Sequence, residues 1–380
     1  MKFVTNITTQ NHTGISKTHC YGEPRSITLI LVILLFVLFP FHGNSQNLRL
    51  IHADFHRSTR LENGKILKIL EGHVHLIRDT LTIFADRIEF LEDEQVIHLI
   101  GSVRMQTPNK DVFSQKATYY PETDYLELFN NVKYIDSSRI LRTENATIDL
   151  KRNYLRSPVA VNVLQLKDNS FVSSDSGAAD TENNRYYFTG NAYFYKPDSS
   201  ENDAKIWADK FEIYQREGDI LFKAIDSVKI IRGQLNAKCQ RADYYIDRGI
   251  IYLSGDPHAE WDLNEMISDT MIIFIDEETN QPQKFNLIDH AEVFSPLDST
   301  RKRENYLSGR NIIAHFRDGE INWIEAIDNA TSNYYIENEE ESNSGMNHAS
   351  ADTIRMYLKE QEIDSVAIIG GIEGTYNPEN

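Results

Sequence analysis

His52, Asp54 and His56 stand at alternate positions, so an extended chain would place all three side chains on one face. Two imidazoles and a carboxylate can bind a transition metal, and His73 and His75 follow later in the chain. However, Asp54 occupies a position that recurs through the sequence, where other copies carry Gln or Arg. A position that accepts such different side chains is typical of a structural role. We therefore predict no metal site.

Carboxylate clusters are the next candidates for chemistry, because paired acids serve glycosidases and also bind calcium. Acidic pairs at 93–94 and 277–278 and the run 339–341 lie in predicted turns of a chain with 57 Asp and Glu residues, so solvated turns account for them. Cys239 occupies the repeat position held elsewhere by Ser114, which indicates a small structural residue and not a nucleophile. The sequence has no G-x-S-x-G, phosphate-binding loop, G-x-G-x-x-G or H-E-x-x-H motif. We therefore predict that the protein is not an enzyme and uses no cofactor.

The elements that position these residues are copies of one unit that repeats ten times. The first half of the unit is clearest in Ser114–Tyr120 and Cys239–Tyr245, which match as small, Gln, basic, Ala, polar, Tyr and Tyr. The second half ends in a small residue, any residue and then Val or Ala, as in Gly72–Val74 and Gly101–Val103. The second position of the first half recurs at Asp54, Asp86, Gln115, Glu144, Asp175, Asp209, Gln240, Asp269, Arg310 and Asp352.

Apolar and polar residues alternate in both halves of the unit, which is typical of strands with one buried face. Between positions 84 and 90, for example, Phe84, Ile88 and Phe90 alternate with Arg87 and Glu89. Each unit is therefore predicted to be a strand, a short polar turn and a second strand. Ten such units predict an all-β chain of about twenty short antiparallel strands. Because one unit cannot bury its apolar face alone, stacked units should share one interior in an elongated, folded-over, jellyroll-like sheet.

The residues expected to face this interior are large and mostly apolar. They could form an ordinary packed core, or they could line a lipid-holding trough if the two sheets stand far enough apart. Four basic residues, Arg104, Lys116, Lys210 and Arg241, could then pair with lipid phosphates near the mouth of the trough. The inward set is Phe84, Ile88, Phe90, Val103, Met105, Phe113, Tyr119, Val132, Tyr134, Phe194, Trp207, Phe211 and Ile213.

The first 45 residues are expected to be a targeting segment and not part of the folded domain. Lys2, Lys17 and Arg25 precede the apolar run 27–41, which is short for a bilayer span of about 20 residues but suits a signal peptide. Small residues favour cleavage after Ser45. We expect export with cleavage at that point, and the alternative is a retained anchor at residues 27–41.

Charge and cysteine content exclude several classes of protein. The chain has 39 Lys and Arg residues against 57 Asp and Glu, a formal net charge of −18, so its surface repels phosphate backbones and no nucleic-acid partner is expected. Only two cysteines are present, Cys20 and Cys239. This number excludes a disulfide-stapled scaffold and a Cys-rich zinc site.

The repeated units resemble the OstA-like (organic-solvent-tolerance) repeats of periplasmic lipopolysaccharide-transport proteins, in particular the OstA-like family of Bacteroidetes-type bacteria. The resemblance is best over residues 48–260. It implies a V-shaped β-jellyroll whose inner face shelters lipid acyl chains, in a protein that carries lipopolysaccharide across the periplasm. The stretches that carry it are Ile51–Asp54, Leu70–Val74, Ile83–Asp86, Ile100–Val103 and Phe113–Val132.

The resemblance also implies partners and boundaries. The acyl chains of lipid A are the expected ligand, and the end strands are expected to join other lipopolysaccharide-transport components or further copies of the chain, head to tail. Residues 1–45 would be the signal peptide or anchor, residues 46–265 the OstA-like repeats, and residues 266–380 a continuation of the array with longer units. Two other functions stay open here: a β-solenoid enzyme that acts on polysaccharide, and an envelope structural or assembly repeat that binds only protein.

Overall fold

The computed structural model describes residues 48–378 except for 79, 92, 199–202, 217–218, 277–278, 280, 298–302, 337–344 and 361. The expected signal peptide or anchor, including the run 27–41, lies outside the described residues, as do the acidic pair 277–278 and the run 339–341. Within the described part of the chain, no helix is long and apolar enough to cross a membrane.

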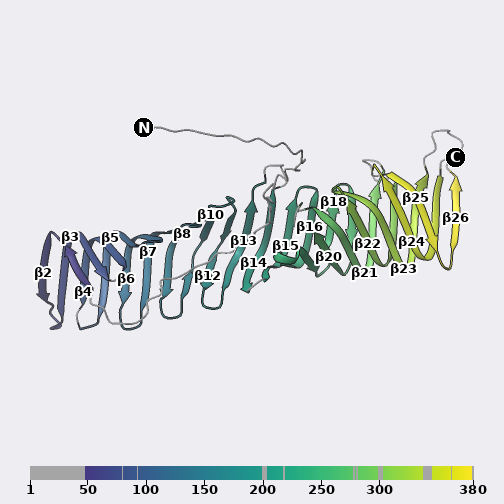
Figure 1. Cartoon of the computed structure of the whole chain (residues 1–380). Coiled ribbons are helices and arrows are strands. Elements are labelled where there is room, and N and C mark those ends of the chain that lie inside the picture. The colour runs from purple at the N-terminus through teal and green to yellow at the C-terminus, as the bar shows by residue number, and fades with distance from the viewer. Residues whose placement is uncertain are drawn as a thin grey trace, which may run out of the picture.

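The chain forms one long antiparallel sheet, and the predicted all-β class is confirmed (Figure 1). The one helical segment among the described residues is the single-turn η1 (Ile246–Arg248). The strands are β1 (Arg49–His52), β2 (Phe55–Arg60), β3 (Ile66–Arg78), β4 (Leu81–Leu91), β5 (Val96–Thr107), β6 (Lys110–Tyr120), β7 (Tyr125–Asp136), β8 (Arg139–Asp149), β9 (Tyr154–Ser157), β10 (Val161–Gln165), β11 (Phe171–Ser174), β12 (Ser176–Asp180), β13 (Arg185–Lys196), β14 (Ala204–Arg216), β15 (Asp219–Arg232), β16 (Leu235–Tyr245), β17 (Ile250–Ser254), β18 (His258–Trp261), β19 (Asn264–Ile267), β20 (Thr270–Ile275), β21 (Pro282–Pro296), β22 (Glu304–Arg317), β23 (Glu320–Ile336), β24 (Gly345–Lys359), β25 (Glu362–Ile369) and β26 (Glu373–Pro378).

Strands that are neighbours in the chain are also neighbours in the sheet. Six bent strands are each interrupted into two segments, namely β1/β2, β9/β10, β11/β12, β17/β18, β19/β20 and β25/β26. The 26 segments therefore make 20 bent strands, in agreement with the ten predicted two-strand units. Most are longer than the five to eight residues over which the alternation is visible, because each strand continues across a bend, and β23 reaches 17 residues.

In nine of the bent strands, two consecutive residues in the left-handed backbone region make the bend. In β5 these are Gly101 (φ 72°) and Ser102 (φ 45°), and the pairing with β6 shifts register between Ile100 and Val103. Left-handed φ is open to Gly and tolerated by Asn and Asp, which explains the small residues of the second repeat signal. Equivalent pairs are Gly72/His73, Asn130/Asn131, Gly190/Asn191, Asp226/Ser227, Gly255/Asp256, Asp289/His290, Asp328/Asn329 and Gly370/Gly371.

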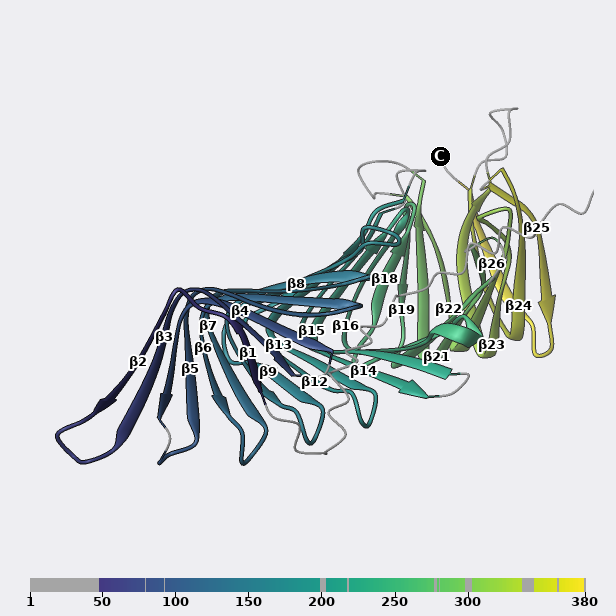
Figure 2. The same cartoon turned by 60° about the vertical axis from the view of Figure 1, so that its left-hand side comes forward.

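The residues at the second position of the first repeat half, such as Asp86 and Asp175, lie beside these bends on the neighbouring strands. We call them the ruler residues. Ser102 Oγ donates a 3.0 Å hydrogen bond to Asp86 Oδ2, and Asn191 Nδ2 donates one of 2.8 Å to Asp175 Oδ2. The two sequence signals thus meet along a single line of bends, which we call the spine. Figure 2 shows the sheet folded into a V along this line.

The spine divides the sheet into two arms. Arm A contains Ile66–Glu71 of β3 and Arg87–Leu91 of β4, and arm B contains Val74–Arg78 and Leu81–Ala85 of the same strands, each with the residues paired to them along the sheet. One continuous buried core lies between the arms and extends from Val74 to Met356.

In the middle of the array, aromatic rings bring the two arms into contact. Phe194 of arm B lies with its ring centroid 6.2 Å from that of Phe222 of arm A. Trp261 of arm B similarly contacts Phe285 and Phe316 of arm A, at 5.8 and 5.2 Å. The interior is therefore packed from both sides over this region.

Candidate functional site

Ten of the thirteen residues predicted to face the interior lie on the inner face of the sheet. Tyr119 is partly buried and packs against the core. Phe90 follows Ile88 at the next inward position and is also partly buried, with the Lys68 ammonium 5.9 Å from its ring centroid. The eight that belong to the buried core are Ile88, Val103, Met105, Val132, Tyr134, Phe194, Phe211 and Ile213.

Phe84, Phe113 and Trp207 face outward instead, and the prediction for them was wrong. Phe84 lies between the buried Ile83 and Ala85, and its ring stacks on His75 with centroids 4.6 Å apart. The physical reason is the bend, which inserts a residue into the alternation at the ruler position. Strict period two therefore fails across the spine.

The other two outward residues make cation–π contacts on the outer face. The Arg104 guanidinium lies 5.4 Å from the Phe113 ring centroid, and the Lys229 ammonium lies 5.4 Å from that of Trp207. Tyr193 completes the second group, with its ring 5.2 Å from Trp207. These rings cover the outside of arm B and are not available to an interior ligand.

At the N-terminal end the interior opens into a pocket between the arms. Its space totals about 550 Å³, including the part open to solvent. Aliphatic and sulfur-containing side chains replace the aromatic rings found in the middle of the array. The lining residues are Leu48, Leu76, Arg78, Leu81, Ile83, Ile97, Leu99, Met105, Tyr119, Leu126 and Leu150.

Met105 and Tyr119 are the only lining residues that the sequence analysis placed in the inward set. Leu81 and Ile83 were missed because the alternation was extended through Asp86 without the shift at the bend. The ruler residue could have revealed these positions. The alternation of inward and outward side chains shifts by one residue there, so inward positions before it are odd-numbered in β4 and those after it are even-numbered. Leu150 lies just beyond β8, and no repeat signal marks it.

Two polar side chains close one side of this pocket. Arg78 Nη1 of arm B donates a 2.9 Å hydrogen bond to the Tyr119 hydroxyl of arm A, which in turn donates to Asp124 Oδ1 at 2.8 Å. Burial raises the pKa of Tyr119, and the bond to Asp124 raises it further. The phenol therefore keeps its proton and can donate it to the carboxylate.

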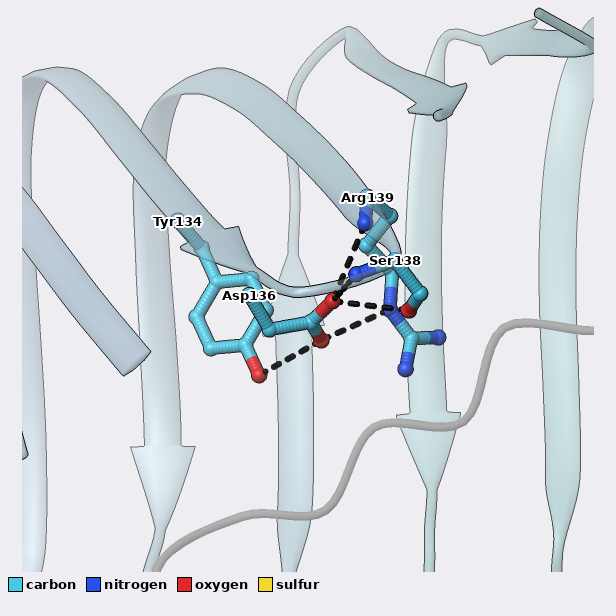
Figure 3. A network of polar contacts seen from close by, with 4 residues as sticks. All are labelled: Tyr134, Asp136, Ser138 and Arg139. Atoms are coloured by element: carbon cyan, nitrogen blue, oxygen red, sulfur yellow. Dashed lines mark hydrogen bonds and ion pairs between the residues drawn. The ribbon is translucent and has the colours of Figure 1, made fainter. Parts of the chain in front are cut away.

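A buried polar network stabilises the turn between β7 and β8 (Figure 3). Asp136 Oδ1 accepts hydrogen bonds from Ser138 N, Ser138 Oγ and Arg139 N, at 2.8, 2.7 and 3.0 Å. Its Oδ2 accepts from Arg139 Nε at 2.8 Å and from the Tyr134 hydroxyl at 3.0 Å. Burial alone would raise the pKa of Asp136, but the bonds from Ser138 and Arg139 outweigh it and lower the pKa.

None of the four basic residues proposed to pair with lipid phosphates faces the interior. Arg104 Nη2 lies 3.2 Å from Asp111 Oδ1, and Arg241 binds Asp243 on the outer face. Lys210 pairs with Glu212, and Lys116 is exposed at the spine. That prediction was wrong for the same reason as for Phe84, because these residues occupy outward positions next to the bend.

The histidine cluster surrounds a spine carboxylate. His73 Nδ1 lies 2.9 Å from Asp54 Oδ2, and His52 Nε2 lies 3.0 Å from Asp54 Oδ1. The bonds to His73 and His52 lower the pKa of Asp54, and the bond to Asp54 raises the pKa of His73. The described residues contain no group of three or more His, Cys, Asp or Glu side chains placed to hold a metal ion.

Cys239 is buried and serves as a small core residue. Its Sγ donates to the carbonyl oxygen of Arg241 at 3.3 Å, and burial raises its pKa to about 11. A thiol with a raised pKa is a poor nucleophile, since the thiolate is the reactive form.

This chain was compared with curated proteins, with solved structures and with models of protein families. Among curated proteins none matches this chain. Among solved structures, the chain is similar to LptH, described as the LptA-homologous periplasmic component of the conserved lipopolysaccharide transport device from Pseudomonas aeruginosa. The identity is 15%, the match covers 29% of this chain and 80% of that chain, and the TM-score is 0.26. The narrower assignment to Bacteroidetes-type bacteria stays a prediction.

The family described as LptA/(LptD N-terminal domain) LPS transport protein matches residues 51–154 and 171–279. These two segments contain most of the spine between Asp54 and Asp269, and together they make up more than half of the 380 residues. The resemblance seen in the repeats is thereby confirmed, and the chain belongs to the LptA/(LptD N-terminal domain) family of lipopolysaccharide transport proteins, which are not enzymes.

Proposed function

We propose that this protein binds lipopolysaccharide in the periplasm, shelters its acyl chains between the two arms and bridges towards the outer membrane. The observation that carries the proposal is the N-terminal pocket, in which nine of eleven lining residues are apolar. Transfer of each acyl CH₂ group from water into such a surface is favourable by about 0.8 kcal/mol. A pocket that takes even part of one acyl chain therefore gains substantial binding energy.

The rest of the molecule suits this task. The chain has a formal net charge of −18, and in the described residues most acidic side chains lie on turns and outward positions, which favours solubility of an elongated protein with an apolar interior. Longer acyl segments need the packed middle of the array to yield, and rings from opposite arms, such as Phe194 and Phe222, would then move apart. We infer that ligand enters at the N-terminal end, where mostly aliphatic side chains line the pocket.

The end strands support the proposed partners. Phe55 of β2 is 72% exposed, and β26 is exposed along its whole length. In the described part of the chain, β2 pairs only with β3, and β26 pairs only with β24. Their free edges offer unpaired amide and carbonyl groups to a strand of another lipopolysaccharide-transport component or of a second copy.

Site-specific photocrosslinking in cells tests the proposal. A benzoylphenylalanine in place of Met105, inside the pocket, should capture lipopolysaccharide. The same group in place of Phe113, which lies on the adjacent strand but faces outward, is the matched control and should capture none. Equal capture at both positions, or none at Met105 in a folded and exported protein, would contradict binding between the arms.

An envelope-assembly repeat that binds only protein is the second candidate, and the ring packing of Trp261 with Phe285 and Phe316 favours it. It predicts end-strand binding without any lipid captured at Met105. The polysaccharide-active enzyme considered above is abandoned, because the family is one of non-enzymatic transport proteins.

A further inference from the structure

The two arms differ in the charges that they turn towards the interior. On arm A, every inward position of the described residues from β4 to β25 is uncharged, as illustrated by the sequence Ile88, Phe90, Leu99 and Ile97 along two paired strands. Lys68 of β3, next to the N-terminal end strand, is the nearest inward charge on that arm. The arm A face is thus a plain apolar surface.

Arm B carries five cations and one acid at its inward positions between β3 and β15. Each lies two residues from a buried core residue, at the inward position next to the turn, so together they follow one edge of the interior. We call this row the cationic rim. Its cations, each with the core residue that fixes its direction, are Arg78 (Leu76), Lys110 (Val112), Arg139 (Leu141), Lys196 (Phe194) and Arg232 (Ile230).

The spacing of the cationic rim is regular. Successive cations are separated by three, two, three and two steps between neighbouring bent strands. Since neighbouring strands lie about 4.8 Å apart, the cations recur about every 10–14 Å along the interior. The row begins at the pocket, whose lining includes Arg78.

Acids lie near this row, but they are fewer than its cations. Asp198 is close enough to Lys196 and Arg232 to favour their charged forms, and Asp136 favours that of Lys110. Asp136 is the one inward acid on these strands, and its carboxylate is already taken by Arg139 and Ser138. Lys196 Nζ also forms an ion pair with Asp168, with 3.8 Å between Nζ and Oδ2. A row in which cations outnumber acids stands out in a chain with 57 acidic and 39 basic residues.

Holding these cations at the edge of an apolar interior has an electrostatic cost. Burial lowers the pKa of Lys110, Lys196 and Arg232, although nearby acids offset part of this effect. An anion that binds beside them replaces lost hydration with charge-assisted hydrogen bonds. An amphiphile satisfies both surfaces at once, with its chain on the apolar face and its anionic group at this edge.

We propose that the cationic rim binds the phosphate or carboxylate groups of the amphiphile whose acyl chains occupy the interior, and so determines which edge its headgroup faces. This inference rests on the function proposed above and adds to it a headgroup site on one arm only. The regular spacing lets a headgroup pass from one cation to the next as the ligand moves along the interior. Arm A offers no equivalent row, so the bound ligand has a single orientation about the long axis.

A charge-removal variant tests the proposal. Lys110→Gln/Lys196→Gln/Arg232→Gln removes three rim cations, none of which lines the pocket, and leaves the hydrogen bonds between Asp136 and Arg139 in place. Lys133→Gln/Lys229→Gln/Lys238→Gln is the matched control, since it removes the same charge from outward positions of the same arm. A third variant, Lys110→Arg/Lys196→Arg/Arg232→Lys, keeps every charge and shows whether altered side-chain packing alone has an effect.

Binding would be measured for three amphiphiles with the same alkyl chain: tetradecyl phosphate, tetradecanoate and uncharged tetradecyl maltoside. Each would displace N-phenyl-1-naphthylamine from the purified protein at low ionic strength. We expect the rim variant to lose affinity for the two anions by about tenfold or more, with unchanged affinity for the maltoside. The control and the charge-keeping variant should behave as the original protein, and excess inorganic phosphate should compete weakly because it has no chain.

The results separate the two proposals. If the maltoside binds and the rim variant keeps full affinity for both anions, the headgroup site is wrong and the apolar site stands. If no amphiphile binds the original protein, both proposals are wrong. Loss of anion affinity in the outer-face control as well would show a general effect of net charge and would also overturn the headgroup site. Competition by inorganic phosphate equal to that of tetradecyl phosphate would mark a site for free anions.

Discussion

The hydrogen bond from Arg78 Nη1 to the Tyr119 hydroxyl joins the two arms of the bent sheet across 2.9 Å, beside the pocket at the N-terminal end of the interior. The Arg78 guanidinium also lies 5.8 Å from the Tyr119 ring centroid. In the middle of the array, aromatic rings of the two arms meet in the packed interior, whereas here the arms meet through a polar contact that can exchange with water.

Tyr119→Phe should therefore loosen the mouth of the pocket. It removes the bonds to Arg78 and Asp124 while keeping the ring, and we expect a loss of about 1 kcal/mol in the free energy of unfolding. Entry of N-phenyl-1-naphthylamine, followed by stopped-flow fluorescence, should become faster. Tyr120→Phe is the control, because the Tyr120 hydroxyl bonds Glu127 on the outer face. An unchanged entry rate in Tyr119→Phe would show that the bond does not restrict access.

The geometry of the bends predicts that replacing a glycine with alanine costs more stability at a bend than in an open turn. A Cβ at Gly101 would lie 2.3 Å from Asp86 Oδ2 at φ +72°, whereas a Cβ at Gly64 would meet nothing within 4 Å at φ +83°. Gly64→Ala should cost about 1 kcal/mol, from the backbone alone. Gly101→Ala should cost about 2–3 kcal/mol, because the clash adds to the same backbone strain.

A double-mutant cycle in urea isolates the clash. In an Asp86→Ala background, most of the extra cost of Gly101→Ala should disappear, because the carboxylate is gone and only the Cβ of residue 86, at 3.0 Å, remains close. If the two substitutions instead add independently, the contact between the ruler residue and the bend is not a source of specificity along the spine.

Two arginines in similar turns predict very different stabilities. Arg139 and its partner Asp136 have side chains only 4% and 9% exposed, whereas Arg152 beside Asp149 is 83% exposed. Arg139→Gln leaves a buried carboxylate without its charged partner and should cost about 2–4 kcal/mol. Arg152→Gln should cost about 0.5 kcal/mol or less. Chemical denaturation at neutral pH measures both, and similar values for the two would refute the structural role of the buried pair.

The pair His73–Asp54 makes stability depend on pH. The pKa of His73 is raised above its usual 6.5 by the hydrogen bond to Asp54, so this contribution is complete below about pH 6.5 and is lost as the pH rises through the raised value. The pKa of Asp54 is lowered below 3.8, so its own contribution is lost only as the pH falls below that value. Both contributions are present at mildly acidic pH.

His73→Asn should therefore lower the melting temperature more at about pH 5.5 than at about pH 8.5. Asn is chosen because position 73 has φ 46°, which Asn tolerates. His348→Asn, at a histidine bonded to Asn333 and not to a carboxylate, is the control. An equal effect of His73→Asn at both pH values would rule out the charged pair.

Most of the fold could be predicted from the sequence repeat. Alternation predicted the strands, and the two signals marked the ruler residues and the bends, as at Asp86 and Gly101. What alternation could not reveal is that these two signals lie side by side and offset the inward positions by one. This offset depends on backbone φ and is the reason why Phe84, Phe113 and Trp207 were assigned to the wrong face.

The candidate site was less predictable than the fold. The pocket depends on the separation of the arms, which follows from the size of side chains that meet from distant strands, such as Leu76 and Leu126. The cationic rim does have a local signal, since Arg78, Lys196 and Arg232 each lie five residues after the second residue of a bend. That signal can be recognised only when it is known that the alternation of inward and outward side chains shifts by one residue at the bend.

The pairing order also bears on how such proteins change in size. Because each bent strand pairs only with the strands before and after it, a two-strand unit can be gained or lost without altering any other pairing. Each unit lengthens the sheet by about 10 Å. The distance that the molecule can span between two attachment points is therefore proportional to its number of two-strand units. Gene duplication or deletion of a unit would change this distance in fixed steps.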